Sequence, residues 1–319
     1  MAAHRKNPLL AFLRKRNHVS GVTGLAASPG GIGIARIEQL PGRAPVLASC
    51  EFRECAAPAQ PGILAELVRE QHLDAAHCVS VVDDKDFSLL LVEAPQVDPS
   101  ELKAAVRWRI RELIDFHIDD VIVDVFDIPG QQERGRPKLM YVVAARIATV
   151  QQHIGLLEGA GVGLQVIDIP ELCQRNVAAQ LPEDQSGVAV LRLGRHGGLL
   201  TLTRQGALYL SRSMDTGVSQ LRDPAQLERL VDAIVLEVQR SLDYYESHFS
   251  LPPIGTLVIA PTEEPLPGLL SRFGASLGIA VRMLDMNALF ETTVALPDAL
   301  QARCFMAIGA ALRREEKAL

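Results

Sequence analysis

The chain has 319 residues, of which 48% are hydrophobic and 22% are charged, with a formal net charge of -6 and a sequence pI near 5.8. This is globular composition, sufficient for two domains, and an acidic chain without a basic stripe has no overall field that would attract nucleic acid. The longest apolar runs, such as 87–92 and 254–260, are far shorter than the roughly 20 residues that a membrane-spanning helix needs. We therefore expect no nucleic-acid partner and no membrane-spanning helix.

The first 18 residues mix basic side chains with apolar ones, among them Leu9, Leu10 and Phe12. They lack the uninterrupted apolar stretch and the cleavage site of a secretory signal, so we expect a cytoplasmic protein. Basic and apolar side chains together can attach a segment weakly to an anionic membrane surface. Residues 1–18 are interpreted as a basic tail that is either a peripheral membrane contact or a disordered end.

The cysteines and histidines show no metal-binding pattern. The five cysteines are scattered and contain no C-x-x-C pair, which indicates reduced thiols. His72 and His77 lack the spacing of four residues that a zinc-binding helix uses. We predict no metal site.

Hydrophobic periodicity and turn residues predict the elements of the first half. A hairpin is predicted around Ser28-Pro29-Gly30-Gly31, and Asp98 and Pro99 begin a helix. The predicted strands are 19–27, 32–40, 46–52, 79–82, 87–92, 121–128, 139–145 and 166–169. The predicted helices are 62–70, 98–114, 147–160 and 170–179.

The second half repeats the opening pattern after a predicted linker at 180–186. The predicted strands are 188–193, 199–203, 207–213, 256–260 and 281–284, and the predicted helices are 224–249, 267–277 and 298–317. Each half therefore begins with three short antiparallel strands and continues with alternating helices and strands. That arrangement favours a duplicated α/β protein with two lobes.

Four segments carry a family resemblance. They are ELKAAVRWRIRELIDFHIDDVIVDVFD at 101–127, the stretch 141–168 with VVAAR and GAGVGLQVIDI, LEVQRSLDYY at 236–245, and MAIGAALR at 306–313. With the order of elements, they resemble the actin-like pilus assembly proteins of the PilM type, most closely the MshI branch of mannose-sensitive haemagglutinin (MSHA) pili. The resemblance implies a bilobed actin-like (ribonuclease H-like) α/β fold with a small inserted subdomain.

The resemblance also sets the expected domains and partners. The first lobe is expected at 19–180, with the insertion at about 94–146, and the second lobe at 187–319. Family members lie at the cytoplasmic face of the inner membrane and bind the cytoplasmic tail of a PilN-like bitopic protein. A cytoplasmic scaffold for biogenesis of a type IV, MSHA-like pilus, peripheral at the inner membrane, is therefore expected, and a homo-oligomer is left open.

Two alternatives remain. One is a nucleotide-dependent actin-like ATPase of the same machine. The other is the actin-like cytoplasmic domain of a type II secretion platform, which a following transmembrane helix would mark. Fold likeness alone does not choose between them, so the site has to be interpreted residue by residue.

The nucleotide motifs of actin-like ATPases are altered in this chain. Such enzymes place Asp-x-Gly in the turn between the first two strands of each lobe, where carboxylates hold Mg²⁺ and glycine admits the phosphates. The resemblance puts Ala26 and Ser28 at the first Asp and Gly, and Arg192 and Gly194 at the second pair. The glycine-rich turn near the adenosine is replaced by a segment with two prolines that begins at Pro261.

A degenerate nucleotide site near these residues is therefore expected. The chain is predicted to be a pseudo-ATPase that has no catalytic residues and requires no cofactor. Weak ATP binding is left open, for example at a phosphate site rebuilt around Arg192.

Aromatic residues in the expected insertion are candidates for partner binding. Trp108, the single tryptophan, lies on the predicted helix 98–114, and Phe116 follows that helix. Trp108 is either a partner anchor, since aromatic residues dominate interface hot spots, or a core residue of the subdomain. Trp108 and Phe116 are predicted as partner-binding residues.

Overall fold

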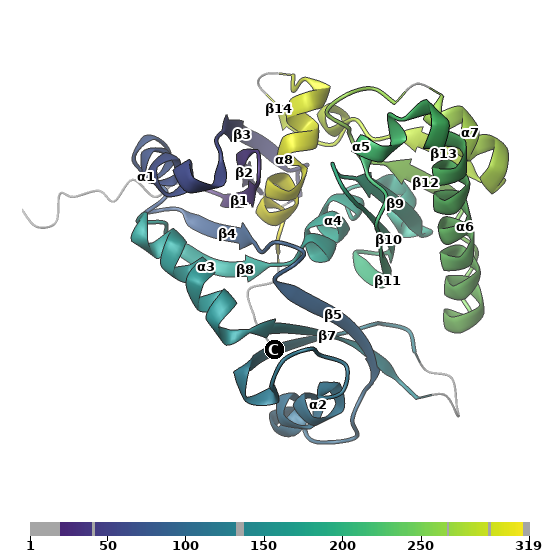
Figure 1. Ribbon diagram of the computed structural model, residues 1–319, viewed down its shortest axis with the longest axis horizontal. Coiled ribbons are helices and arrows are strands. Elements are labelled where there is room, and N and C mark those ends of the chain that lie inside the picture. The colour runs from purple at the N-terminus through teal and green to yellow at the C-terminus, as the bar shows by residue number, and fades with distance from the viewer. Residues whose placement is uncertain (1–19, 40–41, 132–136, 267, 293–294, 315–319) are drawn as a thin grey trace, which may run out of the picture.

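Two α/β lobes lie side by side, with a smaller third unit below them, in a computed structural model of the chain (Figure 1). The structure describes residues 20–39, 42–131, 137–266, 268–292 and 295–314, so the predicted tail at 1–18 lies outside the described residues. None of the described helices combines the length and apolar character needed to cross a bilayer.

The first lobe is built on a six-stranded sheet in the order β14-β3-β2-β1-β4-β8. Its strands are β1 (Val22–Ser28), β2 (Gly31–Glu38), β3 (Val46–Glu54), β4 (His77–Val81), β8 (Leu164–Asp168) and β14 (Glu291–Thr292). β1 pairs antiparallel with β2 and parallel with β4. Helices α1 (Gln60–Gln71) and α3 (Ile147–Gly159) pack on one face of the sheet, where Leu25, Leu67 and Leu157 are buried.

The second lobe has a five-stranded sheet in the order β11-β10-β9-β12-β13. Its strands are β9 (Val188–Leu193), β10 (Gly198–Arg204), β11 (Ala207–Met214), β12 (Thr256–Ile259) and β13 (Ala280–Met283). Its helices are α5 (Val218–Leu221), α6 (Pro224–Phe249) and α7 (Leu269–Leu277). A meander followed by two parallel strands occurs in the same order in both lobes, which confirms the duplicated α/β fold.

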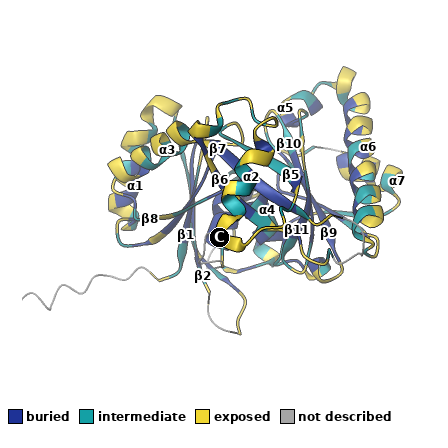
Figure 2. Cartoon of the chain, turned by 90° about the horizontal axis from the view of Figure 1, so that it is seen from below, coloured by how far each residue is buried: buried dark blue, intermediate teal, exposed yellow. Residues whose placement is uncertain are grey.

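Two helices, α4 (Pro170–Ala178) and α8 (Asp298–Ala311), lie between the two sheets (Figure 1). They approach their neighbours so closely that only glycine fits at the contacts. A Cβ at Gly309 would lie 2.3 Å from the Cys173 carbonyl oxygen, and one at Gly24 would lie 1.9 Å from that of Ala307. One continuous core therefore joins both lobes through these helices. Figure 2 shows this buried centre between outer helices whose far faces are exposed.

The third unit is a three-stranded antiparallel sheet in the order β5-β7-β6. It consists of β5 (Phe87–Glu93), β6 (Val121–Asp127) and β7 (Leu139–Arg146), with α2 (Leu102–Ile110) packed on one face. β5 begins before the predicted insertion at 94–146, so the unit that pairs as one sheet starts at Phe87. The opposite face, with Leu89, Leu91 and Tyr141, packs against the second lobe.

Several segments differ from the sequence-based expectation. The predicted linker at 180–186 is packed, because Leu181 and Asp184 are buried and Asp184 accepts hydrogen bonds from Thr203 and Gly206. The last helix ends at Ala311, before the predicted 317. The predicted helix 98–114 begins as the 3-10 helix η3 (Pro99–Glu101) and continues as α2 to Ile110. Other short elements were not predicted, namely α5, β14, η2 (Ala57–Ala59), η4 (Ile118–Asp120), η5 (Pro182–Gln185) and η6 (Met286–Ala288).

Candidate functional site

The turn between β1 and β2, where the resemblance places the first Asp-x-Gly motif, is a closed hairpin. Ala26 pairs with Gly33, and Ser28 pairs with Gly31. The Ser28 hydroxyl donates to the Gly31 carbonyl over 3.2 Å, and the Ser28 carbonyl accepts from Nε2 of Gln60 over 2.7 Å. The polar groups of Ser28 are therefore engaged inside the turn, and Ala26 supplies no ligand oxygen from its side chain.

The turn between β9 and β10 carries a cation at the second motif. The Gly194 N–H donates to the Gly197 carbonyl over 2.8 Å, and the Gly194 carbonyl accepts from the Val218 N–H over 2.8 Å. The guanidinium of Arg192 points back at this turn, with its two terminal nitrogens 3.7 and 3.8 Å from where a Cβ on Gly194 would lie. A positive group therefore occupies the part of the fold where the motif would have a carboxylate.

Carboxylates surround Arg192 without forming a metal site. Burial lowers the pKa of the Arg192 guanidinium, while Asp84 and Glu263 raise it. A hydrogen bond with Asp83, together with burial, raises the pKa of Asp84. Within the described part of the chain, no group of three or more His, Cys, Asp and Glu side chains is arranged to hold a metal ion. The residues at these turns therefore do not fit the oxygen-ligand set that Mg²⁺ prefers.

The loop after β12 is fixed to both lobes by ion pairs. It begins at the buried Pro261 and carries Glu263 and Glu264. Arg222 pairs with Glu264 over 2.6 Å, while Nε of Arg303 on α8 donates to Glu263 over 3.1 Å. Arg303 also pairs with Glu54 on β3 of the first lobe. The ion pairs partly neutralise both carboxylates, and the pairing of Glu263 with Arg303 holds the loop against α8.

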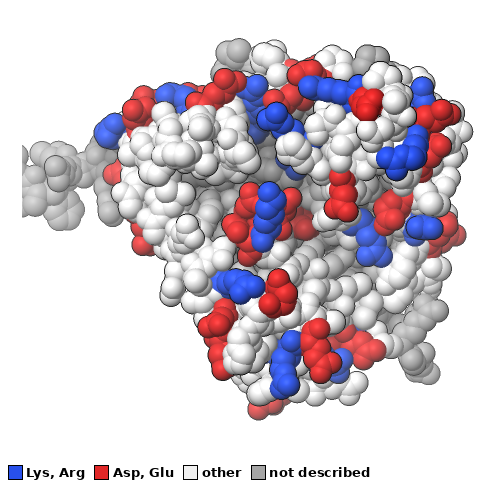
Figure 3. Space-filling view, viewed as in Figure 1, with Lys and Arg blue, Asp and Glu red and all other residues white. Residues whose placement is uncertain are grey.

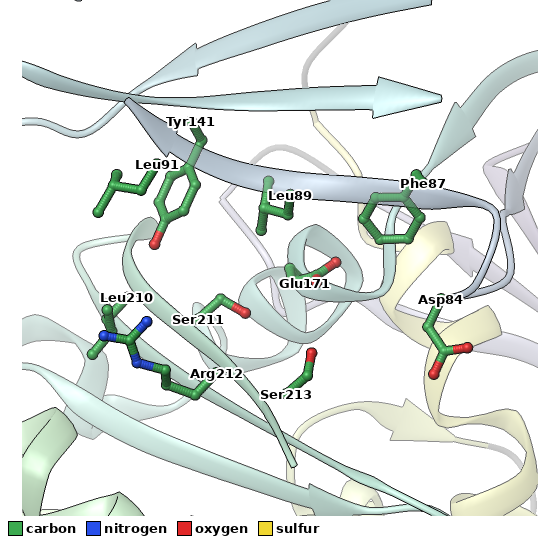
Figure 4. A pocket seen from close by; sticks show the side chains of 10 residues that line it. All are labelled: Asp84, Phe87, Leu89, Leu91, Tyr141, Glu171, Leu210, Ser211, Arg212 and Ser213. Carbon is green, nitrogen blue, oxygen red and sulfur yellow. The ribbon is translucent and has the colours of Figure 1, made fainter. Parts of the chain in front are cut away.

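A cavity of about 390 Å³ lies where the third unit meets both lobes (Figure 4). One wall is the inner face of β5 and β7, the opposite wall is the edge strand β11, and the first turn of α4 lies between them. Its lining residues are Asp84, Phe87, Leu89, Leu91, Tyr141, Glu171, Leu210, Ser211, Arg212 and Ser213. Apolar and hydrogen-bonding groups therefore converge in one concave site, which is the usual character of a binding pocket.

Two of the polar groups in the cavity are already engaged. The Tyr141 hydroxyl donates to the Tyr209 carbonyl over 3.3 Å, which joins the third unit to β11. Arg212 lies 3.8 Å from a carboxylate oxygen of Glu237 and 5.8 Å from the Tyr244 ring centre. Glu171 differs from both, because its Oε2 has no hydrogen-bond partner among the described residues. The residue is 6% exposed, and burial raises the pKa of its carboxyl to about 7.

The predicted partner residues lie away from this cavity. Trp108 is 69% exposed on α2, so the alternative that it closes the core of the subdomain is wrong. Phe116 is half-buried against the same core, and the Arg146 guanidinium lies 4.4 Å from its ring centre. Because α2 covers the opposite face of the three-stranded sheet from the cavity, Trp108 is not part of the cavity wall.

The residues that line the cavity were not predicted as partner-binding residues from the sequence. Glu171 follows Pro170 at the start of α4, where an acidic residue is ordinary because it complements the helix dipole. Phe87, Leu89 and Leu91 alternate along a strand, which signals a buried face but does not reveal what covers it. Only the folded arrangement brings these residues to β11.

Comparison with known proteins relates part of the chain to a known family. Residues 90–226 match the family model for the type IV pilus assembly protein PilM. That region contains most of the third unit, α4 and the meander of the second lobe. The chain has an actin-like fold, and its residues 90–226 resemble the PilM family. The resemblance to this family expected from the sequence is confirmed, whereas the match does not distinguish the MshI branch.

Solved structures share the fold of the chain. A PilM-PilN type IV pilus biogenesis complex is similar at 20% identity over 92% of this chain and 98% of the other, with a TM-score of 0.72. A Bacteroides thetaiotaomicron protein with an actin-like ATPase fold and unknown function is similar at 8% identity, with a TM-score of 0.51. The similarity covers 87% of this chain and 95% of that protein.

The cytoplasmic domain of EpsL, an inner membrane component of the type II secretion system of Vibrio cholerae, is similar at 14% identity over 89% of this chain and 93% of that domain, with a TM-score of 0.47. No curated protein matches the chain.

Proposed function

We propose that this PilM-type protein is a non-catalytic scaffold of type IV pilus assembly that binds the cytoplasmic tail of a PilN-like inner-membrane protein. The observation that carries the proposal is the cavity of about 390 Å³ between the third unit and both lobes. This volume is in the range of ligand pockets and admits side chains of a bound peptide. The fold shared with a PilM-PilN complex supports a PilN-like partner.

The non-catalytic role rests on the two turns. Phosphoryl transfer in nucleotide-hydrolysing enzymes relies on a metal ion that neutralises the phosphates. Ala26 lacks a carboxylate, and Arg192 presents a cation at the second turn. Any residual nucleotide binding would therefore come from attraction of phosphate to Arg192 and would not depend on Mg²⁺.

The proposed location is the cytoplasmic face of the inner membrane, where the tail of a bitopic protein is accessible. On the face shown in Figure 3, basic and acidic side chains are interspersed, and no continuous basic surface suited to nucleic acid is visible. The resemblance of the four segments and of the order of elements to the MshI branch makes an MSHA-like pilus the first machine to examine.

Co-purification tests the proposal. The tagged full chain would be co-expressed with a PilN-like inner-membrane protein of the same organism, either intact or without its cytoplasmic tail. We expect the intact protein to co-purify after detergent extraction and the tail-deleted protein to be lost. Equal recovery of both forms would remove the tail from the proposal.

A further inference from the structure

Among the described residues that line the cavity, Glu171 carries a buried side-chain oxygen without a hydrogen-bond partner. Its side chain lies between Leu89 on one wall and Ser211 and Ser213 on the other (Figure 4). The residue is only 6% exposed, and its Oε2 has no hydrogen-bond partner among the described residues. A buried acceptor without a donor is costly, so a ligand that brings a donor to Oε2 is favoured over one that does not.

The charges around the cavity select the kind of donor. Asp84 lines the same cavity and raises the pKa of Glu171, as does Asp168, after the larger effect of burial. Arg212 is the single basic residue among the lining residues, and its guanidinium is directed to Glu237 and to the Tyr244 ring. The position facing Glu171 therefore favours a cation.

The shape of the cavity selects an extended chain. β11 is the edge strand of the second sheet, and four consecutive residues of it, 210–213, line the cavity. An edge strand leaves one side of its backbone without sheet partners, and an added peptide strand can pair with it. The facing wall of Phe87, Leu89 and Leu91 would receive apolar side chains of such a peptide.

We propose that the cavity binds an extended peptide along β11 and that a lysine or arginine side chain of this peptide pairs with Glu171. The inference rests on the proposed function, because the bound peptide is the tail of the PilN-like partner. Beyond that function, it identifies Glu171 as the residue that selects the tail, and it requires a basic side chain in the tail. Charged hydrogen bonds of this kind are stronger than neutral ones, and they fix the register of a bound strand.

A double-mutant cycle tests this pairing. The probe is a fluorescein-labelled synthetic peptide with the tail sequence of a PilN-like protein of the same organism. In a second set of peptides, each Lys or Arg is replaced in turn by Gln. Binding to the full chain and to its Glu171→Gln variant would be measured by fluorescence anisotropy at pH 8. Glu228→Gln, an exposed carboxylate on α6, is the matched control.

We expect Glu171→Gln to weaken the tail by at least tenfold and one Gln-substituted peptide to bind the unchanged protein at least tenfold more weakly. The Gln-substituted peptide should bind the Glu171→Gln variant only slightly more weakly than it binds the unchanged protein, because each substitution removes the same contact. The substituted peptides are measured against the unchanged protein. They therefore test whether a basic side chain of the tail is required even if the Glu171→Gln variant does not fold.

The opposite results separate this inference from the proposed function. If the tail binds and neither substitution weakens it, or if a tail without Lys and Arg binds equally well, the role of Glu171 is overturned while the scaffold function stands. If no tail peptide binds the unchanged protein, the proposed function fails and the inference fails with it.

Discussion

Arg313, two residues beyond α8, donates from its Nη1 to Oδ2 of Asp168 at the end of β8 over 2.8 Å. Asp168 is almost fully buried, and burial raises the pKa of its carboxyl while Arg313 lowers it. This pair connects the end of the C-terminal helix to the strand that leads into α4. The arrangement of the central helices therefore depends on a charge pair in the core.

Arg313→Leu should lower the free energy of unfolding by about 3–5 kcal/mol near pH 7, because it leaves the buried Asp168 carboxylate without its cation. The loss should shrink toward pH 4, where Asp168 can take up a proton. Urea denaturation at both pH values measures it, with the exposed neighbour change Arg314→Leu as the control. Equal losses for the two variants would contradict the structural role of the pair.

Glu171→Gln should stabilise the protein increasingly as the pH rises. Burial raises the pKa of Glu171 to about 7 from 4.5, so the folded state binds this proton more tightly than the unfolded state. The stability that Glu171 contributes is complete below pH 4.5 and is lost as the pH rises through 7. The stability of the variant relative to the unchanged protein should therefore increase by up to about 3 kcal/mol between pH 5 and pH 8.

Urea titrations at pH 5 and pH 8 test this expectation, and Glu228→Gln on the exposed side of α6 serves as the control. The control should change stability little at either pH. A pH-independent difference for Glu171→Gln would show that its carboxyl is not desolvated in the folded protein.

Gly309 and Gly155 form a matched pair of helical glycines. An added Cβ would lie 2.3 Å from the Cys173 carbonyl oxygen at Gly309 and would meet nothing within 4 Å at Gly155. Gly309→Ala should lower the free energy of unfolding by about 1–3 kcal/mol or more through overpacking. Gly155→Ala should raise it by about 0.5–1 kcal/mol through the lower flexibility of alanine. A stabilising Gly309→Ala would show that α4 and α8 are farther apart than described.

Mg-ATP should leave the melting temperature unchanged at millimolar concentration. A ligand present at about 100 times its Kd stabilises a protein by about 2.7 kcal/mol, which is readily detected as a shift of a few degrees. A small shift with ATP that persists in EDTA would fit phosphate attraction by Arg192. A shift of several degrees that EDTA abolishes would show a metal-dependent nucleotide site and would contradict the pseudo-ATPase proposal.

Elements with strong local signals were predictable from the sequence. The predicted helix 224–249 has the bounds of α6, because Asp223 caps its first turn, Pro224 stands at its first position and Ser250 ends it in the left-handed conformation. Apolar residues recur along one face of this helix, and they are buried in the second lobe. Local sequence and tertiary packing agree here, so the prediction needed no further information.

The cavity could not be predicted because its chemistry arises from tertiary contacts. Glu171 has the position of an ordinary acidic residue in a first helical turn, and its burial results from the approach of β5 and β11. The predicted helix 98–114 extends past Ile110, where α2 ends, and Leu113 beyond that end is exposed. Periodicity identifies a face but not the length over which a partner covers it.

The most direct measurement is a titration of the full chain with the tail peptide of the PilN-like protein, carried out with EDTA, with Mg²⁺ alone and with Mg-ATP. A non-catalytic scaffold should bind the tail with a Kd well below ~1 mM, which corresponds to about -4 kcal/mol, and the Kd should be the same in all three conditions. A tail that binds only in the presence of Mg-ATP, or that does not bind in any of the three conditions, would contradict the proposed function.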